Sequence, residues 1–177
     1  MNITIIGCGK TKLAHAAPAK DLYTGSLFRA SRKWAEAQGG PWFILSAAHG
    51  IVSPDIVIEP YDTTLADIDA KVWARDVCHS IVSLCAFHRA AFVTLLAGAE
   101  YADPLDACPV ILRQPLRGKQ IGERLAWLAG KPAAPARPET LAALVLDVDK
   151  ASPGAATAEM VLPADVWARM VALARAA

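Results

Sequence analysis

Short apolar runs alternate with longer segments whose apolar residues recur every three or four positions. The apolar runs lie at residues 3–6, 42–46, 92–96 and 110–112. Their length and lack of alternation predict buried strands of a parallel sheet. The longer segments run from about 25 to 39, 66 to 88 and 118 to 130. Strands that alternate with helices in this way predict an α/β fold of three layers around a mostly parallel central sheet.

The periodicity also predicts which helix faces are buried. The three stripes are Leu27, Ser31, Trp34 and Ala35; Val77, Ile81, Leu84, Cys85 and His88; and Ile121, Leu125 and Leu128. Residues 51–64 interrupt the pattern, and Pro54 and Pro60 within them predict a structured loop. Ligands of such sheets bind beyond the carboxyl ends of the strands. We therefore expect a site where the loops at 7–12 and 46–64 lie side by side.

The composition changes after Gly130. Residues 131–138 are rich in proline and alanine and predict a stiff linker that closes a main domain of residues 1–130. Residues 139–177 predict a C-terminal extension with an apolar run and an amphipathic helix around Trp167. About forty residues rarely sustain a core alone, so we expect this extension to dock on the main domain or on a partner.

Composition excludes several classes of protein. The chain has 177 residues, 54% hydrophobic and 20% charged, which excludes disorder of the whole chain. No stretch of about 18 apolar residues runs without a charge, so no membrane span is expected. The first residues do not resemble a signal peptide. The four cysteines (Cys8, Cys78, Cys85 and Cys108) lack the spacing of a disulfide framework, so we expect reduced thiols and a cytoplasmic location.

The net charge of +1 hides an uneven distribution. Residues 1–35 and 113–124 are predominantly basic, whereas residues 55–76 are predominantly acidic. Two interpretations stay open: the basic segments converge on a polyanion, or they are ordinary solvated helix faces.

A glycine-rich loop follows the first strand. Gly7-Cys8-Gly9-Lys10-Thr11-Lys12 is not a Walker loop, because the partner glycine would have to stand at Thr4. Its backbone N–H groups and lysines can still hold a phosphate or carboxylate; the alternative is a tight turn with solvated lysines. Cys8 lies near Lys10, which favours a thiolate, although packing alone would also explain this cysteine.

The loop after the second strand offers acid–base and stacking groups. His49 follows the strand at Ser46, and its charge can change near neutral pH; a structural histidine is the alternative. Tyr61 and Asp62 suit stacking on a base and reading its polar edge; the alternative is that Asp62 or Thr64 caps the next helix. The stretch from Tyr23 to Ser26 has the same ambiguity. Cys78, His79, Cys85 and His88 on one helix cannot surround a zinc ion, so no metal or cofactor is expected.

Several motifs together resemble a small domain family of unknown function found in phages and bacteria. The matching stretches are residues 8–12, 21–28, 45–51, 54–55, 58, 60–62, 64–65, 115–118, 121–122 and 124–128. That family is distantly similar to the YaaA peroxide-stress proteins, which bind DNA and whose core is similar to the uracil-DNA glycosylase type of α/β fold. The resemblance implies handling of nucleic acid or of a nucleobase. The chain lacks the Asp-Pro-Tyr and His-Pro-Ser motifs of uracil-DNA glycosylases themselves.

These observations lead to three functional hypotheses. The first is a DNA glycosylase-like hydrolase that cleaves the N-glycosidic bond of a modified base in DNA or a nucleotide, in phage–host conflict. The alternatives are a non-catalytic DNA-binding stress protein and a small-molecule phosphate enzyme. In the first hypothesis the catalytic residues are His49, Asp62 and Asp55. The substrate-binding residues are Cys8, Lys10, Thr11, Lys12, Tyr23, Ser26, Ser46, Tyr61 and Arg117.

Overall fold

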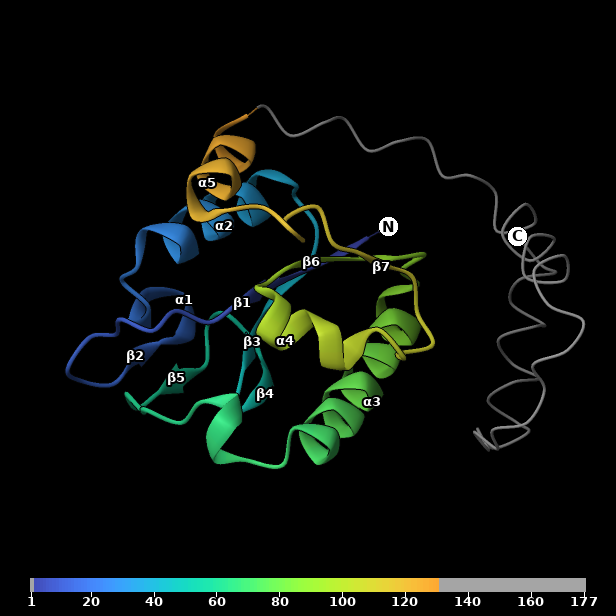
Figure 1. The fold of residues 1–177 in the computed structure, drawn as a ribbon, viewed down its shortest axis with the longest axis horizontal. Helices are drawn as coiled ribbons and strands as arrows, with labels where there is room; N and C mark the ends of the chain where they lie inside the picture. Colours follow the sequence, from blue (N-terminus) through green and yellow to red (C-terminus); the bar gives the residue numbers. More distant parts are fainter. Residues whose placement is uncertain (1, 131–177) are drawn as a thin grey trace, which may run out of the picture. The chain divides into compact units, whose positions relative to one another are not determined.

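The central sheet has five strands in the order β4-β3-β1-β6-β7 (Figure 1). The computed structural model describes residues 2–130, so the predicted linker at 131–138 and extension at 139–177 lie outside the described residues. Four strands are parallel neighbours: β1 (Ile3–Gly7), β3 (Trp42–Ser46), β6 (Val93–Leu96) and β7 (Leu112–Arg113). The edge strand β4 (Gly50–Val52) is antiparallel to β3. The expected α/β fold with a mostly parallel sheet is confirmed.

Helices cover both faces of the sheet, because successive strand residues point to opposite sides. Ile3 and Ile5 of β1 pack in one core with α3 (Ala70–His88). Ile6 packs in a second core with α2 (Ser26–Ala37) and α5 (Ile121–Ala129). The α2 and α5 helices lie together over that face in Figure 1, and α3 lies over the other.

The predicted loop at 51–64 contains regular structure. Gly50 has a φ of +63°, which lets the chain reverse after β3 and form β4 before Pro54 is reached. Further on, β5 (Val57–Ile58) pairs with β2 (Ala17–Pro18) in a separate two-stranded sheet beside α1 (Ala19–Leu22). Prolines therefore bound these short strands rather than prevent them, and the prediction of a loop is wrong for β4 and β5.

The long helix begins later than residue 66. Thr64 and Asp67 cap each other around a 3-10 turn at Leu65–Asp67. The Asp69 carboxylate then accepts hydrogen bonds from the backbone N–H groups of Lys71 and Val72, so α3 starts at Ala70.

The apolar stripe predicted for the last helix is also partly wrong. Leu128 of α5 is buried, but Ile121 is 63% exposed. Ile121 stands in the first turn of the helix, where it lines a pocket instead of the core.

Two of the four cysteines form a disulfide. Cys78 of α3 is bonded to Cys108, and their Cα atoms are 5.5 Å apart. Cys108 follows α4 (Ala99–Ala102) and the 3-10 helix Asp103–Leu105, which packs against α3. Sequence spacing could not reveal this contact because 30 residues separate the pair. The expectation of reduced thiols is wrong for this pair, whereas Cys8 and Cys85 are free.

The chain changes direction across the sheet at β1. It leaves β1 through α2 to reach β3 on one side, then passes through α3 to β6 on the other side. The carboxyl ends of β1 and β6 therefore flank the point where the connections diverge, which is the usual position of a ligand site in such sheets. Within residues 2–130, no helix combines the length and the apolar character needed to cross a membrane.

Candidate functional site

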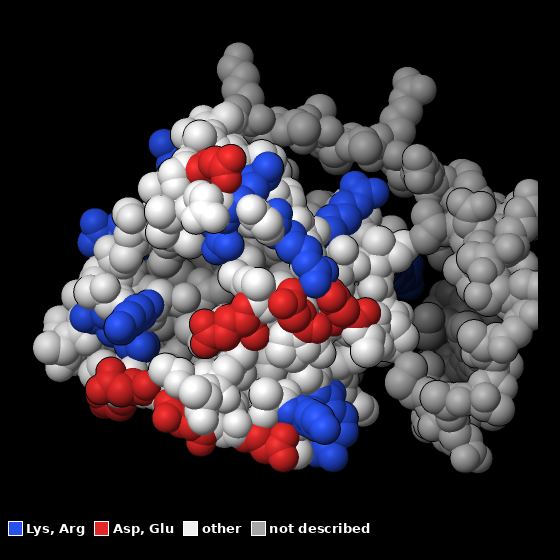
Figure 2. Space-filling model, viewed as in Figure 1, with Lys and Arg blue, Asp and Glu red and all other residues white. Residues whose placement is uncertain are grey.

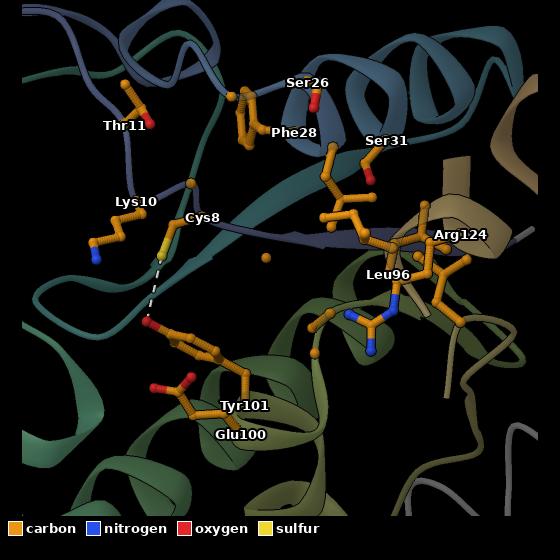
Figure 3. Close-up of a pocket in the computed structure, with 18 residues that line it drawn as sticks. Cys8, Lys10, Thr11, Ser26, Phe28, Ser31, Leu96, Glu100, Tyr101 and Arg124 are labelled. Atoms are coloured by element: carbon orange, nitrogen blue, oxygen red, sulfur yellow. Dashed lines mark hydrogen bonds between the residues drawn. The ribbon is translucent and has the colours of Figure 1, made fainter. Parts of the chain in front are cut away.

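A pocket of about 350 Å³ lies at the carboxyl ends of β1 and β6 (Figure 3). The turns after these strands contribute Cys8 and Gly98, and the start of α2 contributes Ser26. Its polar side chains are Cys8, Lys10, Thr11, Ser26, Ser31, Glu100, Tyr101 and Arg124. Apolar walls come from side chains that include Leu27, Phe28, Leu96, Leu116 and Ile121. The volume falls within the range of about 300–1,000 Å³ that is usual for small-molecule sites.

The glycine-rich loop is held firmly against the start of α2. The Cys8 backbone N–H donates to the Leu45 carbonyl at 2.8 Å, which ties the loop to β3. Backbone hydrogen bonds of 2.9 Å join Leu13 to Leu22 and Thr24 to Thr11. Gly9 permits this close packing, since a Cβ atom there would lie 3.3 Å from the Cβ of Tyr23. The loop and the helix start therefore form adjoining walls of the pocket.

Acid–base groups gather where α4 begins. Glu100 and Tyr101 line the pocket from α4, and the Cys8 thiol lies 3.5 Å from the Tyr101 hydroxyl. Burial and the nearby Cys8 raise the pKa of Tyr101 above its ordinary value. The phenol is therefore protonated at neutral pH and can donate a hydrogen bond to a ligand. In Figure 3 the Glu100 carboxylate lies close to this ring.

A chain of hydroxyl groups stands beside the carboxyl end of β3. The Tyr61 hydroxyl lies 2.8 Å from the Tyr23 hydroxyl and 2.7 Å from Ser46 Oγ. Ser46 Oγ also accepts a hydrogen bond from the His49 backbone N–H at 3.1 Å, and its carbonyl accepts one from Trp73 Nε1 at 3.0 Å. Burial, with Cys8 close by, raises the pKa of Tyr61 to about 12. These bonds fix the loop after β3 but do not place it in the pocket.

Further contacts of Tyr61 engage two of the predicted site residues. The Lys12 Nζ lies 4.3 Å from the centroid of the Tyr61 ring, a cation–π contact. The His49 ring meets the same ring edge-on at 5.0 Å between centroids. Both side chains are thus used in packing around Tyr61.

The structure divides the residues predicted from the sequence into three groups. Cys8, Lys10, Thr11 and Ser26 line the pocket. Lys12, Tyr23, Ser46, His49 and Tyr61 form the neighbouring network. The remaining three, Asp55, Asp62 and Arg117, lie outside both groups.

Two of these remaining residues have charged partners. Asp55 forms a salt bridge with Lys20 at 2.6 Å. The Arg117 guanidinium binds Asp103 and Asp106 at 2.8 and 2.7 Å. Asp62 is exposed, and the N-cap of the long helix is Asp69 rather than Asp62 or Thr64, since Thr64 caps only the 3-10 turn at Leu65–Asp67. Catalytic roles for His49, Asp55 and Asp62 stay predictions.

Sequence reasoning missed four polar residues of the pocket: Ser31, Glu100, Tyr101 and Arg124. Glu100 and Tyr101 could have been found, because they follow the third predicted strand and the rule about strand ends applies there too. Arg124 gave no such signal, since it reaches the pocket from α5. Among residues 2–130, no three histidine, cysteine, aspartate or glutamate side chains are grouped so as to hold a metal ion.

The surface around the pocket has mixed charge. Figure 2 shows basic and acidic side chains interleaved on this face, with no broad basic surface. Part of the basic charge is neutralised locally, as in the ion pairs of Arg117. This arrangement suits a small anionic ligand better than a long polyanion.

The part of the chain that forms the pocket matches the model of a known protein family. Residues 3–130 match DUF6884, a family of unknown function. The chain is also similar to the uncharacterized protein YfjM of Bacillus subtilis (strain 168), with 29% identity over 112 residues, which cover 59% of this chain and 75% of the relative. No solved structure matches the chain. The family match includes every residue that lines the pocket.

Proposed function

We propose that this chain, which belongs to the DUF6884 family of unknown function, is an N-glycosidase that releases the base from a nucleoside or nucleotide. The observation that carries the proposal is the Glu100 carboxylate at the edge of a small pocket, next to the protonated Tyr101 phenol. A nucleobase is proposed as the leaving group because the sequence motifs led us to expect a distant similarity to YaaA proteins and to the uracil-DNA glycosylase type of fold.

Cleavage of an N-glycosidic bond creates positive charge on the sugar. The bond between C1′ and the base nitrogen breaks with its electron pair on the base, and a water oxygen bonds to C1′. One proton of that water ends on the released base. A carboxylate next to the sugar stabilises the developing oxocarbenium ion, as in glycosidases. Glu100 supplies this charge, and the Tyr101 hydroxyl is the hydrogen-bond donor for the departing base.

The size of the pocket favours one nucleotide as the ligand. A cavity of about 350 Å³ accommodates a single nucleotide but not a duplex. The interleaved charges around it argue for a free nucleoside or nucleotide over DNA (Figure 2). A base extruded from DNA would also fit, so modified DNA belongs in the test.

The test measures release of free base. The full chain is incubated with nucleosides, nucleotides and DNA that carry ordinary or modified bases, and mass spectrometry detects the liberated base. We expect Glu100→Gln to lower turnover by about a hundredfold or more without changing the melting temperature, because Glu100 is exposed. Glu59→Gln is the matched control: this glutamate is also exposed but lies outside the pocket. Absence of base release from every substrate, or full turnover by Glu100→Gln, would refute the proposal.

A further inference from the structure

The segment that carries Glu100 and Tyr101 makes no backbone hydrogen bonds to its neighbours in the fold. It leaves the sheet after β6, contains α4 and the 3-10 helix Asp103–Leu105, and returns to the sheet at β7. Within the described part of the chain, the backbone hydrogen bonds of residues 99–109 all stay inside residues 98–110. A region attached in this way can open locally while the rest of the domain stays folded.

The noncovalent contacts that hold this segment in place are limited. Among residues 99–109 only Ala102, Leu105 and Cys108 are buried, and of these only Leu105 is a large apolar side chain. Two salt bridges join the segment to Arg117, but the side chains of both pairs are about half exposed. Such exposed ion pairs contribute little to stability.

The placement of α4 nevertheless determines the geometry of the pocket. The Tyr101 ring meets the Trp73 ring edge-on at 5.7 Å between centroids, and the Tyr101 hydroxyl lies 3.5 Å from the Cys8 thiol. Both Glu100 and Tyr101 enter the pocket from α4 (Figure 3). Because reacting groups must be held in register, a displacement of α4 by about 1 Å is enough to impair catalysis.

A covalent bond joins the end of this segment to α3. Cys108 is disulfide-bonded to Cys78 of α3, and no other disulfide is formed within residues 2–130. The preceding 3-10 helix also packs against α3, so the bond fixes the contact through which α4 is positioned. Cys78 is only partly buried, so that a small thiol can reach its sulfur.

We propose that this disulfide is a redox switch of the pocket: the intact bond holds α4 in place, and its reduction lets residues 98–109 move away from α3 with Glu100 and Tyr101. The inference concerns regulation of the proposed active site and rests on the proposed function. The reductant is a dithiol. One of its thiolates attacks Sγ of Cys78, the S–S bond breaks, and the Cys108 sulfur leaves as a thiolate that takes up a proton. The second thiol then attacks the mixed disulfide and releases the Cys78 thiol, so that two electrons pass to the protein and the reductant ends as a disulfide.

Hydrogen exchange followed by mass spectrometry tests the movement of α4. The full chain is compared in its oxidised form, after treatment with dithiothreitol, and after reoxidation. We expect the amides of residues 99–109 to exchange about tenfold faster or more in the reduced form, at times when β1 is still protected in both forms. Exchange of residues 99–109 that does not change, or that speeds up only together with loss of protection in β1, would overturn the inference.

Cysteine variants separate this disulfide from other effects of the reductant. The double variant Cys78→Ser with Cys108→Ser should show the fast exchange without dithiothreitol and should not respond to it. Cys85→Ala is the matched control, because Cys85 is a free, partly buried cysteine of the same helix; this variant should respond as the unmodified chain does. If the double variant fails to fold, the reduced unmodified chain carries the test. A folded double variant that still responds to dithiothreitol would refute the role of this disulfide.

Base release measured on the same samples distinguishes this inference from the proposed function. We expect reduction to lower turnover by about tenfold or more and reoxidation to restore it. Faster exchange of residues 99–109 without base release in either form supports the movement of α4 and refutes the N-glycosidase. Base release at equal rates in the two forms refutes the switch and supports the N-glycosidase.

Discussion

Removing the Tyr61 hydroxyl tests the hydrogen-bonded network beside β3. That hydroxyl is shared between the Tyr23 hydroxyl at 2.8 Å and Ser46 Oγ at 2.7 Å. After Tyr61→Phe, Ser46 Oγ keeps the His49 backbone N–H. Tyr23, which is 1% exposed, loses its only side-chain partner among the described residues. The substitution thus leaves one buried hydroxyl without a hydrogen bond.

The expected loss of stability follows from the Tyr23 hydroxyl that is left without a hydrogen bond. A buried, unsatisfied hydroxyl costs about 1–3 kcal/mol, whereas loss of one hydrogen bond with removal of the buried group costs about 0.5–1.5 kcal/mol. We therefore expect Tyr61→Phe to lower the free energy of unfolding by about 2 kcal/mol and Tyr23→Phe by about 1 kcal/mol. The double variant removes both hydroxyls, so its loss should be about 1 kcal/mol smaller than the sum of the two single losses.

Urea denaturation followed by circular dichroism measures these differences. The four proteins of the cycle (the unmodified chain, both single variants and the double variant) are unfolded under the same conditions at neutral pH, with equal slopes as the check on two-state behaviour. The double variant is the internal control for loss of aromatic hydroxyls as such. Additive losses, or a Tyr61→Phe variant as stable as the unmodified chain, would refute the shared hydrogen bonding of Tyr61.

Three further predictions concern stability. Because burial raises the pKa of Tyr61 to about 12 and also raises that of Tyr23, the folded state holds protons that an unfolded tyrosine loses near pH 10. The free energy of unfolding should be undiminished below pH 10 and fall as pH rises toward 12, less steeply in the double phenylalanine variant. The Cys78–Cys108 disulfide closes a loop with a sequence separation of 30, so replacing both cysteines with serine should destabilise the protein by about 3–4 kcal/mol, and a reducing agent should then have no further effect on the melting temperature. Asp69→Ala should cost about 1 kcal/mol in denaturant unfolding by removing the N-cap of α3, whereas Asp69→Asn should cost almost nothing; equal losses would contradict the capping role.

Local patterns predicted the layers of the fold well. The continuous apolar runs and the helical stripes lead to β1, β3, β6, α2 and α3, because each of these elements buries a face against the sheet. Short elements were missed where local chemistry outweighs hydrophobic periodicity. A left-handed Gly50 creates β4, and the caps at Thr64 and Asp69 delay the start of α3.

The sequence predicted only those site residues that lie close to the first strand along the chain. Lys10 and Ser26 were expected because they lie in or near the loop that follows the first strand. Arg124 enters the pocket from a helix that follows β7, so only the packing of α5 beside α2 places it there. The pairing of Cys78 with Cys108 likewise depends on a contact between distant segments. Long-range proximity of this kind leaves no periodic trace in the sequence.

The backbone hydrogen bonds between residues 11–13 and 22–24 have a thermodynamic consequence for binding. They hold the lysine-bearing loop and the start of α2 in position before any ligand arrives. A ligand that enters between them does not have to order these walls, so association loses little chain entropy. The heat capacity change on binding should then reflect the area of ligand buried and contain no contribution from loop folding. We therefore expect the fit of the ligand between these preformed walls to set the selectivity of the pocket.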